Sequence, residues 1–281
     1  MSKVNTLEAC ELARELAREA GALIREAFGS ISHVDYKGEV NPVTEADTAA
    51  ETLIIERLRQ AFPDHGILGE ESGGDHRQAA AASDPRPIWL IDPLDGTNNF
   101  AHGFPHFSVS VGLRVDSKMQ LGVVYDPMRD ELFVAQRGNG ATLNGAPIQV
   151  TSTQLLADGF LATGFPYDRR IAAENNVQML DNFLRRSQGV RRVGSAALDM
   201  AYVACGRFDG FWEFRLSPWD VAAATLLVEE AGGRTSDFSG GQDRLYSGDE
   251  VLASNGLIHD EMLRVLREGP AAPHPDYPSP A

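Results

Sequence analysis

The sequence is poor in cysteine and in basic residues, and it has no long apolar run. It holds 2 cysteines in 281 residues, so a disulfide framework or a thiolate metal site is not expected. Lys and Arg number 25 against 40 Asp and Glu, and the formal net charge of -15 would repel nucleic acid and anionic lipid. No stretch approaches the roughly 18 uncharged apolar residues of a membrane span, and no basic segment followed by an apolar run opens the chain. We therefore expect a cytoplasmic protein that binds a small molecule, with no nucleic acid and no membrane as a partner.

The apolar residues follow helical and strand periods that mix along the chain. Apolar side chains spaced by three and four positions predict amphipathic helices over residues 7–28 and 41–63. Alternating stretches rich in valine and phenylalanine predict strands at residues 88–92, 106–115, 119–127, 130–138, 159–165 and 209–214. Two Asn-Gly pairs, at 139–140 and 144–145, predict hairpin turns. Later apolar segments predict helices at residues 195–206, 218–233 and 259–269.

This mixture predicts an α/β layered fold with a substantial mixed or antiparallel sheet. A chain of 281 residues with 43% hydrophobic content lies near the length at which one core begins to divide into two. We expect one domain over residues 1–268, with two lobes of about 1–150 and 151–268. The five prolines of residues 269–281 predict a disordered tail, and residues 75–87 read as an exposed loop. Cys10 and Cys205 both lie in helical patterns and are expected to be buried thiols.

The stretch IDPLDGTNNF places two aspartates three positions apart where a buried strand ends. If residues 88–92 form a central strand, Asp92 lies at its carboxyl end, where ligands gather in α/β sheets. Pro93 has no N–H to donate to a neighbouring strand, so we expect the sheet to stop there. A turn needs neither the second aspartate, Asp95, nor a buried strand that delivers the first. The motif therefore indicates a functional site.

Gly96 and Thr97 are expected to open a short helix whose free N–H groups face an anion. Asp92 and Asp95 flank the same position, and carboxylates repel each other and an anion. Two unit charges about 4 Å apart repel by roughly 4 kcal/mol at an effective dielectric constant near 20. A cation is needed before such a site binds phosphate.

Oxygen ligands without histidine or cysteine favour Mg²⁺, or Mn²⁺, over Zn²⁺. Further acids stand at the ends of other segments: Glu70 follows a short apolar run, and Asp47 and Asp220 lie in the first turns of predicted helices. Each also has an ordinary structural interpretation, as a turn residue or as an acid that interacts with the helix dipole. Spacing alone leaves both interpretations open.

These segments strongly resemble the signatures of the inositol monophosphatase family, in the family's order and over nearly the whole chain except the proline-rich tail. The stretches that carry the resemblance are NPVTEADTAAE at 41–51, GEES at 69–72, WLIDPLDGTNNF at 89–100, GSAALDMAYVACGRFDGFWE at 194–213 and PWDVAAAT at 218–225. The resemblance implies a layered α-β-α-β-α sandwich of the inositol monophosphatase and fructose bisphosphatase type. It also implies a lithium-sensitive hydrolase that uses two or three Mg²⁺ ions, with Mn²⁺ as a substitute, and that usually forms a homodimer.

The family pattern also implies roles for single residues. It implies that the metal ligands are Glu70, Asp92, Asp95, Asp220 and the backbone carbonyl of Leu94. It implies that the catalytic residues are Asp47, Thr97 and Glu70. It implies that the substrate is bound by Asp95, Gly96, Thr97, Gly194, Ser195, Ala196, Glu213 and Asp220. Lys37 resembles a lysine on a mobile loop near the metals.

Two of these residues have simpler interpretations. Ser195 precedes an apolar helix and is first expected to be its N-cap. Glu213 lies in the stretch FWEF, where exposure by strand alternation is the plain alternative, although a carboxylate between large aromatic residues suits hydrogen bonding to ring hydroxyls. Their pocket roles rest on the resemblance.

The expected function is hydrolysis of a phosphate monoester by a metal-activated water, with inositol 1-phosphate as the favoured substrate. Asn98 and Asn99 follow Gly-Thr where nucleotide-directed members of the family tend to have Lys-Glu, and this favours inositol phosphate. Histidinol phosphate is the enzymatic alternative, since an acid such as Glu213 suits its amine. The second alternative is a partner-binding, regulatory protein with incidental phosphatase activity, although every ligand position of the family is present.

Overall fold

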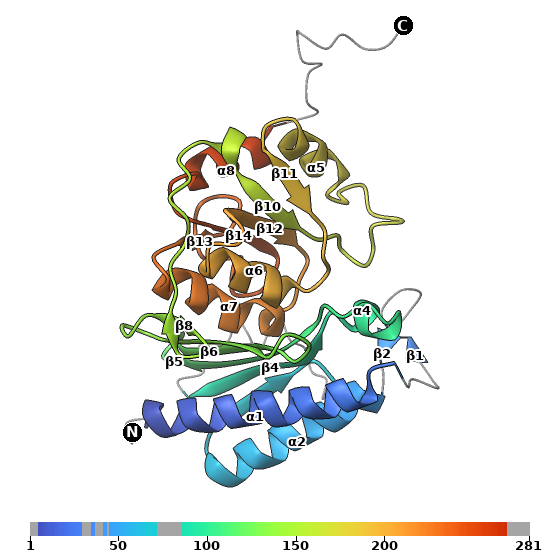
Figure 1. Ribbon diagram of the computed structural model, residues 1–281, viewed down its shortest axis with the longest axis vertical. Helices are drawn as coiled ribbons and strands as arrows, with labels where there is room; N and C mark the ends of the chain where they lie inside the picture. The colour runs from blue at the N-terminus through green and yellow to red at the C-terminus, as the bar shows by residue number, and fades with distance from the viewer. Residues whose placement is uncertain (1–4, 30–34, 37–41, 44, 72–85, 269–281) are drawn as a thin grey trace, which may run out of the picture.

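The structure is a computed structural model that describes residues 5–29, 35–36, 42–43, 45–71 and 86–268. Its elements stack in five layers, helix on sheet on helix on sheet on helix (Figure 1). The predicted α-β-α-β-α sandwich is confirmed. Lys37, most of the predicted loop at 75–87 and the predicted tail at 269–281 lie outside the described residues. None of the helices in the described ranges is long and apolar enough to cross a membrane.

The first outer layer consists of α1 (Thr6–Ala27) and α2 (Glu45–Ala61). Both helices follow the predicted apolar spacing, and the face of α1 that holds Leu16 and Ile24 is fully buried. The helices cover one side of a seven-stranded sheet (Figure 1). A separate two-stranded ribbon pairs β1 (Asp35–Tyr36) with β2 (Pro42–Val43).

The seven-stranded sheet has the order β3-β4-β5-β6-β7-β8-β9. Its strands are β3 (Gly66–Gly69), β4 (Ile88–Asp95), β5 (Ser108–Val115), β6 (Lys118–Asp126), β7 (Glu131–Gln136), β8 (Ala141–Leu143) and β9 (Ala146–Pro147). Only the β3 and β4 pair is parallel, and the remaining pairs are antiparallel. The hairpins β7-β8 and β8-β9 confirm the turns expected at the two Asn-Gly pairs. The short helix α4 (Thr97–Ala101) follows β4, as predicted.

The five-stranded sheet has the order β11-β10-β12-β14-β13. Its strands are β10 (Phe160–Thr163), β11 (Gly189–Arg191), β12 (Gly210–Phe214), β13 (Arg234–Ser236) and β14 (Glu250–Ser254). A 3₁₀ turn, η1 (Leu156–Asp158), precedes it. The helices α5 (Val177–Leu184) and α8 (His259–Leu266) cover its outer face (Figure 1).

The middle layer, formed by α6 (Ala196–Ala204) and α7 (Pro218–Glu230), lies between the two sheets (Figure 1). A helix between two sheets buries apolar residues all round instead of along one stripe, and every residue of α6 is buried. One hydrophobic cluster joins Phe133 of the first sheet, Leu198 of α6 and Phe211 of the second sheet. The two sheets therefore share one packed core.

Two predictions at the ends of elements are wrong. The sheet does not stop at Pro93, because β4 continues to Asp95, which pairs with Ser108 of β5. The pairing register shifts between Asp92 and Asp95, and such an irregularity accommodates a residue without an N–H. Cys205 is only partly buried, because it follows the last residue of α6 at the helix end, whereas Cys10 is buried as predicted.

The middle layer packs closely on the first sheet at Gly122 of β6. A Cβ at this position would lie 2.3 Å from the backbone oxygen of Ala223 in α7. The opposite residue in β5, Gly112, instead has the terminal methyl of Met119 as its nearest neighbour, at 2.8 Å. A backbone cannot move aside as a flexible side chain can.

We therefore expect Gly122→Ala to lower the free energy of unfolding by about 1–3 kcal/mol or more, because overpacking shifts the α7 backbone. Gly112→Ala is the matched control and should have the smaller effect, because Met119 can change rotamer. Urea unfolding followed by circular dichroism measures both. Equal losses in the two variants would contradict this account of the packing.

Candidate active site

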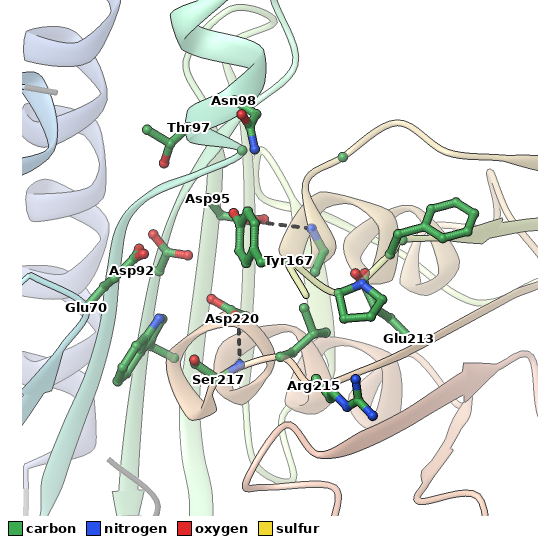
Figure 2. A pocket seen from close by; sticks show the side chains of 18 of the residues that line it. Glu70, Asp92, Asp95, Thr97, Asn98, Tyr167, Glu213, Arg215, Ser217 and Asp220 are labelled. Carbon is green, nitrogen blue, oxygen red and sulfur yellow. Dashed lines mark hydrogen bonds between the residues drawn. The ribbon is translucent and has the colours of Figure 1, made fainter. Parts of the chain in front are cut away.

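The acids singled out in the sequence, apart from Asp47, meet at one cavity between the two sheets. The cavity has a volume of about 270 Å³, and both halves of the chain line it. The first sheet and α4 contribute Glu70, Asp92, Leu94, Asp95, Gly96, Thr97 and Asn98, and the second half contributes Gly194, Ala196, Glu213 and Asp220. Figure 2 shows the four carboxylates of Glu70, Asp92, Asp95 and Asp220 on one side of the cavity.

The parallel pairing of β3 and β4 explains how Glu70 reaches Asp92. Gly69 lies opposite Ile91 in the register. The next residues of the two segments, Glu70 after β3 and Asp92 within β4, therefore lie side by side. The Glu51 carboxylate of α2 accepts a hydrogen bond of 2.8 Å from the N–H of Glu71 and so fixes the turn after β3. The pairing of β3 with β4 and the contact from α2 thus set the position of the Glu70 carboxylate.

Asp95 joins the two halves of the molecule. Its carboxylate accepts hydrogen bonds from the Ser195 hydroxyl at 2.5 Å and from the N–H groups of Ala197 at 2.8 Å and Ala196 at 3.3 Å. These groups form the N-terminus of α6, whose free donors and dipole favour an anion. A side chain of the first sheet therefore caps a helix of the middle layer.

Asp220 has both of the roles that the sequence left open. Its carboxylate accepts the N–H of Ser217 at 2.7 Å and so caps the first turn of α7, and it also faces the cavity. Asp92 and Asp220 are close neighbours in the cluster, and the charge of Asp220 acts against ionisation of Asp92. Asp92 also accepts the N–H of Leu94 at 2.9 Å.

Burial and mutual repulsion perturb the charges of the cluster. Burial, then the neighbouring Glu70, Asp95 and Asp220 carboxylates, raise the pKa of Asp92 well above its usual value. Burial raises the pKa of Asp95 to about 6, although the Ser195, Ala197 and Ala196 donors oppose the shift. Burial and the Asp95 charge raise the pKa of Asp220 to about 7. Without positive charge, the cluster retains protons near neutral pH.

This donor set fits a divalent cation of the hard, oxygen-binding kind. Carboxylates and a backbone carbonyl are the ligands that Mg²⁺ and Mn²⁺ prefer, and no histidine or cysteine is among the described residues that line the cavity. Across the described part of the chain, no three acidic, histidine or cysteine side chains are already arranged to hold an ion. Because the carboxylates raise one another's pKa values, the cluster needs positive charge to ionise fully, and a bound cation would displace the protons that it retains.

Thr97 connects the cavity to Asp47 on α2. The Thr97 hydroxyl lies 3.3 Å from a carboxylate oxygen of Asp47 and 2.9 Å from the carbonyl oxygen of Leu94. Both Asp47 and Thr97 are buried, and Thr97 lines the cavity. The Thr97 hydroxyl thus provides a path along which a proton can pass from a ligand in the cavity to the buried Asp47 carboxylate.

Gly96 permits a close approach between the first half of the chain and the loop before α6. Its φ of 99° lies in the left-handed region, and a Cβ would stand 3.1 Å from the carbonyl oxygen of His106 and 3.2 Å from that of Gly194. The Asn99 side-chain amide donates to the carbonyl oxygens of His106 at 2.7 Å and Val193 at 2.9 Å. Asn99 therefore supports the loops, and Asn98 is the asparagine that lines the cavity.

The remaining predicted pocket residues lie deeper in the second half. Ser195 is fully buried, and its hydroxyl accepts the N–H of Leu198 at 3.4 Å, so its predicted N-cap role is confirmed. The expectation that strand alternation exposes Glu213 is wrong, because both faces of β12 are covered and its carboxylate lines the cavity. Burial raises the pKa of Glu213 to about 8, against the opposing charge of Arg192.

The sequence did not reveal four further residues at or near the cavity. Tyr167, Arg192 and Arg215 line it, and Asp199 of α6 lies buried behind it with one carboxylate oxygen unpartnered among the described residues. Burial, then the charge of Glu213, raise the pKa of Asp199. The first three residues lie outside regular elements and outside any motif. Only long-range folding brings them to the site.

Known proteins resemble this chain over nearly its whole length. A sequence model of the inositol monophosphatase family matches residues 6–271. The inositol-1-monophosphatase of Synechocystis sp. is 45% identical over 261 residues, covering 92% of this chain and 89% of that protein. The Nus factor SuhB of Pseudomonas aeruginosa is 44% identical over 268 residues, covering 91% of this chain and 94% of that protein. The solved inositol monophosphatase of Anabaena (Nostoc) sp. superposes with a TM-score of 0.84 at 43% identity, covering 95% of this chain and 98% of that chain.

The charge state of the cluster predicts that Mg²⁺ stabilises the folded protein. A ligand at about 100 times its Kd stabilises by about 2.7 kcal/mol, so saturating Mg²⁺ should raise the Tm by several degrees. Asp92→Asn should lose most of this shift while remaining folded without metal, because an amide still accepts the N–H of Leu94.

Asp199→Asn is the matched control, since it replaces the carboxyl group of a buried acid that does not line the cavity. It should keep the Mg²⁺ shift of the wild type. Differential scanning calorimetry, with NaCl at equal ionic strength as the reference, measures all three proteins. The same Mg²⁺ shift in Asp92→Asn as in the wild type would show that the ion binds elsewhere.

Proposed function

Because the chain belongs to the inositol monophosphatase family, a family of phosphoric monoester hydrolases, we propose that it is a Mg²⁺-dependent phosphatase that hydrolyses inositol 1-phosphate. The observation that carries this proposal is the group of four carboxylates at one cavity, beside the N-termini of α4 and α6. Such a group attracts divalent cations, and the cations make the cavity attractive to a phosphate dianion. Two or three Mg²⁺ ions with Mn²⁺ as a substitute, lithium sensitivity, a homodimer and a cytoplasmic location form part of the proposal.

Glu70, Asp92, Asp95, Asp220 and the Leu94 carbonyl would hold the ions. Bound Mg²⁺ would supply charge stabilisation of the phosphoryl group and the departing oxygen, and would lower the pKa of water. The N–H groups of Gly96 and Thr97, at the start of α4, would bind phosphoryl oxygens. The cavity closes around the phosphoryl group from both halves of the chain, which favours one orientation of the ester.

Thr97 and Asp47 would direct the attacking water. The Thr97 hydroxyl accepts a proton from the water and passes its own proton to Asp47 along their hydrogen bond. The water oxygen forms a bond to phosphorus as the bond from phosphorus to the alcohol oxygen breaks, and the alcohol oxygen takes the electron pair of that bond and a proton from solvent water, while Asp47 returns its proton to solvent. No covalent intermediate is required, because water is the nucleophile.

The part of the cavity next to the carboxylates suits a polyol. Gly194, Ala196 and Glu213 line it, and Glu213 with a pKa of about 8 is largely protonated at neutral pH. A neutral carboxyl group both donates to and accepts from hydroxyl groups, whereas an ammonium group needs a charged carboxylate. Arg192 also lines the cavity and would repel an amine. These features favour inositol phosphate over histidinol phosphate.

A partner-binding role is the second candidate, because a relative at 44% identity carries the name Nus factor SuhB. That name belongs to the Pseudomonas protein, and a comparable role here would be separate from the cavity. A variant without phosphatase activity separates the two functions, since a binding role survives the loss of turnover.

Asp95→Asn provides this variant and tests the proposed chemistry. Removing the charge of a metal ligand should lower kcat/KM for inositol 1-phosphate by more than about 100-fold. This loss is larger than the one typical of residues that only hydrogen bond to a metal ligand. The far-ultraviolet circular dichroism should stay that of the wild type. Asp181→Asn, on an exposed face of α5, is the control and should keep full activity. Near-normal phosphate release by Asp95→Asn would refute the assigned metal role.

The choice of substrate is tested with inositol 1-phosphate and histidinol phosphate under the same conditions. We expect a higher kcat/KM for the inositol ester. Glu213→Gln should reduce this value by less than about tenfold, because a neutral amide replaces a largely neutral carboxyl group and a hydrogen bond contributes about 1 kcal/mol. A preference for histidinol phosphate that Glu213→Gln abolishes would support the alternative.

A further inference from the structure

The segment that follows β10 covers the cavity and presents a tyrosine to it. Gly164, Phe165, Pro166 and Tyr167 all line the cavity. Tyr167 is 50% exposed, a large value for an aromatic residue. Its hydroxyl makes no hydrogen bond to any residue in the described ranges. Figure 2 shows the phenol ring in the opening, among the labelled carboxylates of Asp92, Asp95 and Asp220.

The carboxylates keep this phenol neutral. Burial of its inner part, and then the charges of Glu70, Asp220, Asp95 and Asp92, raise the pKa of Tyr167 above its usual value. The hydroxyl therefore retains its proton at any physiological pH. It is a hydrogen-bond donor without a partner among the described residues, at the opening of a cavity proposed to bind a ligand rich in oxygen.

The segment is fixed at its start. The Asn176 amide donates to the carbonyl oxygen of Gly164 at 2.5 Å and to the hydroxyl of Thr163 at 2.8 Å, and it accepts from the Trp212 indole at 2.8 Å. A Cβ on Gly164 would lie 2.1 Å from the Glu213 carboxylate oxygens. The backbone that leads to Tyr167 therefore passes directly over Glu213, which lines the part of the cavity assigned above to the alcohol.

The segment is fixed again directly after Tyr167. One guanidinium nitrogen of Arg215 lies 2.7 and 2.9 Å from the two carboxylate oxygens of Asp168. Arg215 has a φ of 61°, an unfavourable value for a residue with a side chain, and its N–H donates to the carbonyl oxygen of Asp249 at 3.0 Å. A strained backbone that the surrounding structure holds in place is characteristic of functional sites. Arg215 thus positions Asp168, and through it the neighbouring tyrosine.

We propose that Tyr167 is a specificity-determining residue, whose hydroxyl donates a hydrogen bond to a hydroxyl oxygen on the alcohol part of the ester and whose ring covers that part. The ion pair between Arg215 and Asp168 holds the phenol in this position. The inference rests on the proposed function, because it names a contact to the same substrate. The proposed contact predicts that Tyr167 lets the cavity distinguish esters by their alcohol part. The carboxylate cluster acts on the phosphoryl group, which all the esters share.

Steady-state kinetics with two esters test this role. Tyr167→Phe removes only the hydroxyl and should raise the KM for inositol 1-phosphate by about tenfold, the equivalent of one hydrogen bond, with kcat little changed. Tyr167→Ala should raise it further. Glycerol 2-phosphate, whose alcohol is small and acyclic, should show at most a twofold change in either variant. Equal changes for both esters, or none, would overturn the role of Tyr167.

The same measurements separate this inference from the proposed function. A wild type that releases no phosphate from either ester in Mg²⁺ refutes both. A wild type that is active, with Tyr167 variants of unchanged ester preference, refutes only the role of Tyr167.

A double-mutant cycle tests the positioning by the ion pair. Asp168→Ala should raise the KM for inositol 1-phosphate in the wild type and have no further effect in Tyr167→Ala. Asp181→Ala removes an exposed ion pair with Arg185 on α5, at 3.0 Å, and is the matched control with no expected effect. Additive effects of Asp168→Ala and Tyr167→Ala would show that the ion pair does not act through the tyrosine.

Discussion

The bonding of one carboxylate, that of Asp95, to the N-terminus of α6 is the interaction on which the site depends. Asp95 stands at the end of β4, and its oxygens accept the donors of Ser195, Ala196 and Ala197 from the other half of the chain. This contact sets the distance between the two halves at the point where the cavity lies. The other carboxylates, from β3, β4 and α7, then face one space instead of separate surfaces.

The same arrangement couples stability to ligand binding. Buried like charges raise one another's pKa values, so the cluster without cations retains protons. A protonated carboxyl group accepts fewer hydrogen bonds than a carboxylate. Positive charge that replaces those protons strengthens every contact across the cavity, and binding to the folded state alone stabilises that state. The middle layer supports this arrangement, because small residues of α7 let its backbone pack closely on β6. A rigid frame thus holds groups that repel each other until a ligand arrives.

Much of this organisation was predictable from local sequence. The periodicity of apolar residues and the helix-capping residues predicted α1, α2, α6, α7 and α8. The Asp-Pro-Leu-Asp-Gly-Thr motif and the other motifs of the family predicted the acids that line the cavity. The short strands β11, β13 and β14 were not predicted, because so few residues carry little periodic signal, and the helix α5 was also missed. The continuation of β4 through Pro93 was missed because an irregular register, set by pairing with β5, accommodates the proline.

The errors at the site have the same origin. Strand alternation suggested an exposed Glu213, but β12 lies between layers of helices and both its faces are buried. The substrate preference drawn from Asn98 and Asn99 stays a prediction; Asn98 lines the cavity, whereas the Asn99 amide bonds to the carbonyl oxygens of His106 and Val193 and supports two loops. Tyr167 and Arg215 carry no local signal, because their meaning comes from neighbours that only the fold brings together.

The central claim is that Glu70, Asp92, Asp95 and Asp220 hold divalent cations in one place. Crystals grown with Mn²⁺ and measured at its absorption edge give the most direct test, because anomalous scattering locates the ion independently of any assumed ligand. The account predicts strong anomalous peaks in the cavity within coordination distance of these carboxylates and the Leu94 carbonyl. Fully occupied Mn²⁺ at other surfaces, with no peak between the four acids, would contradict it.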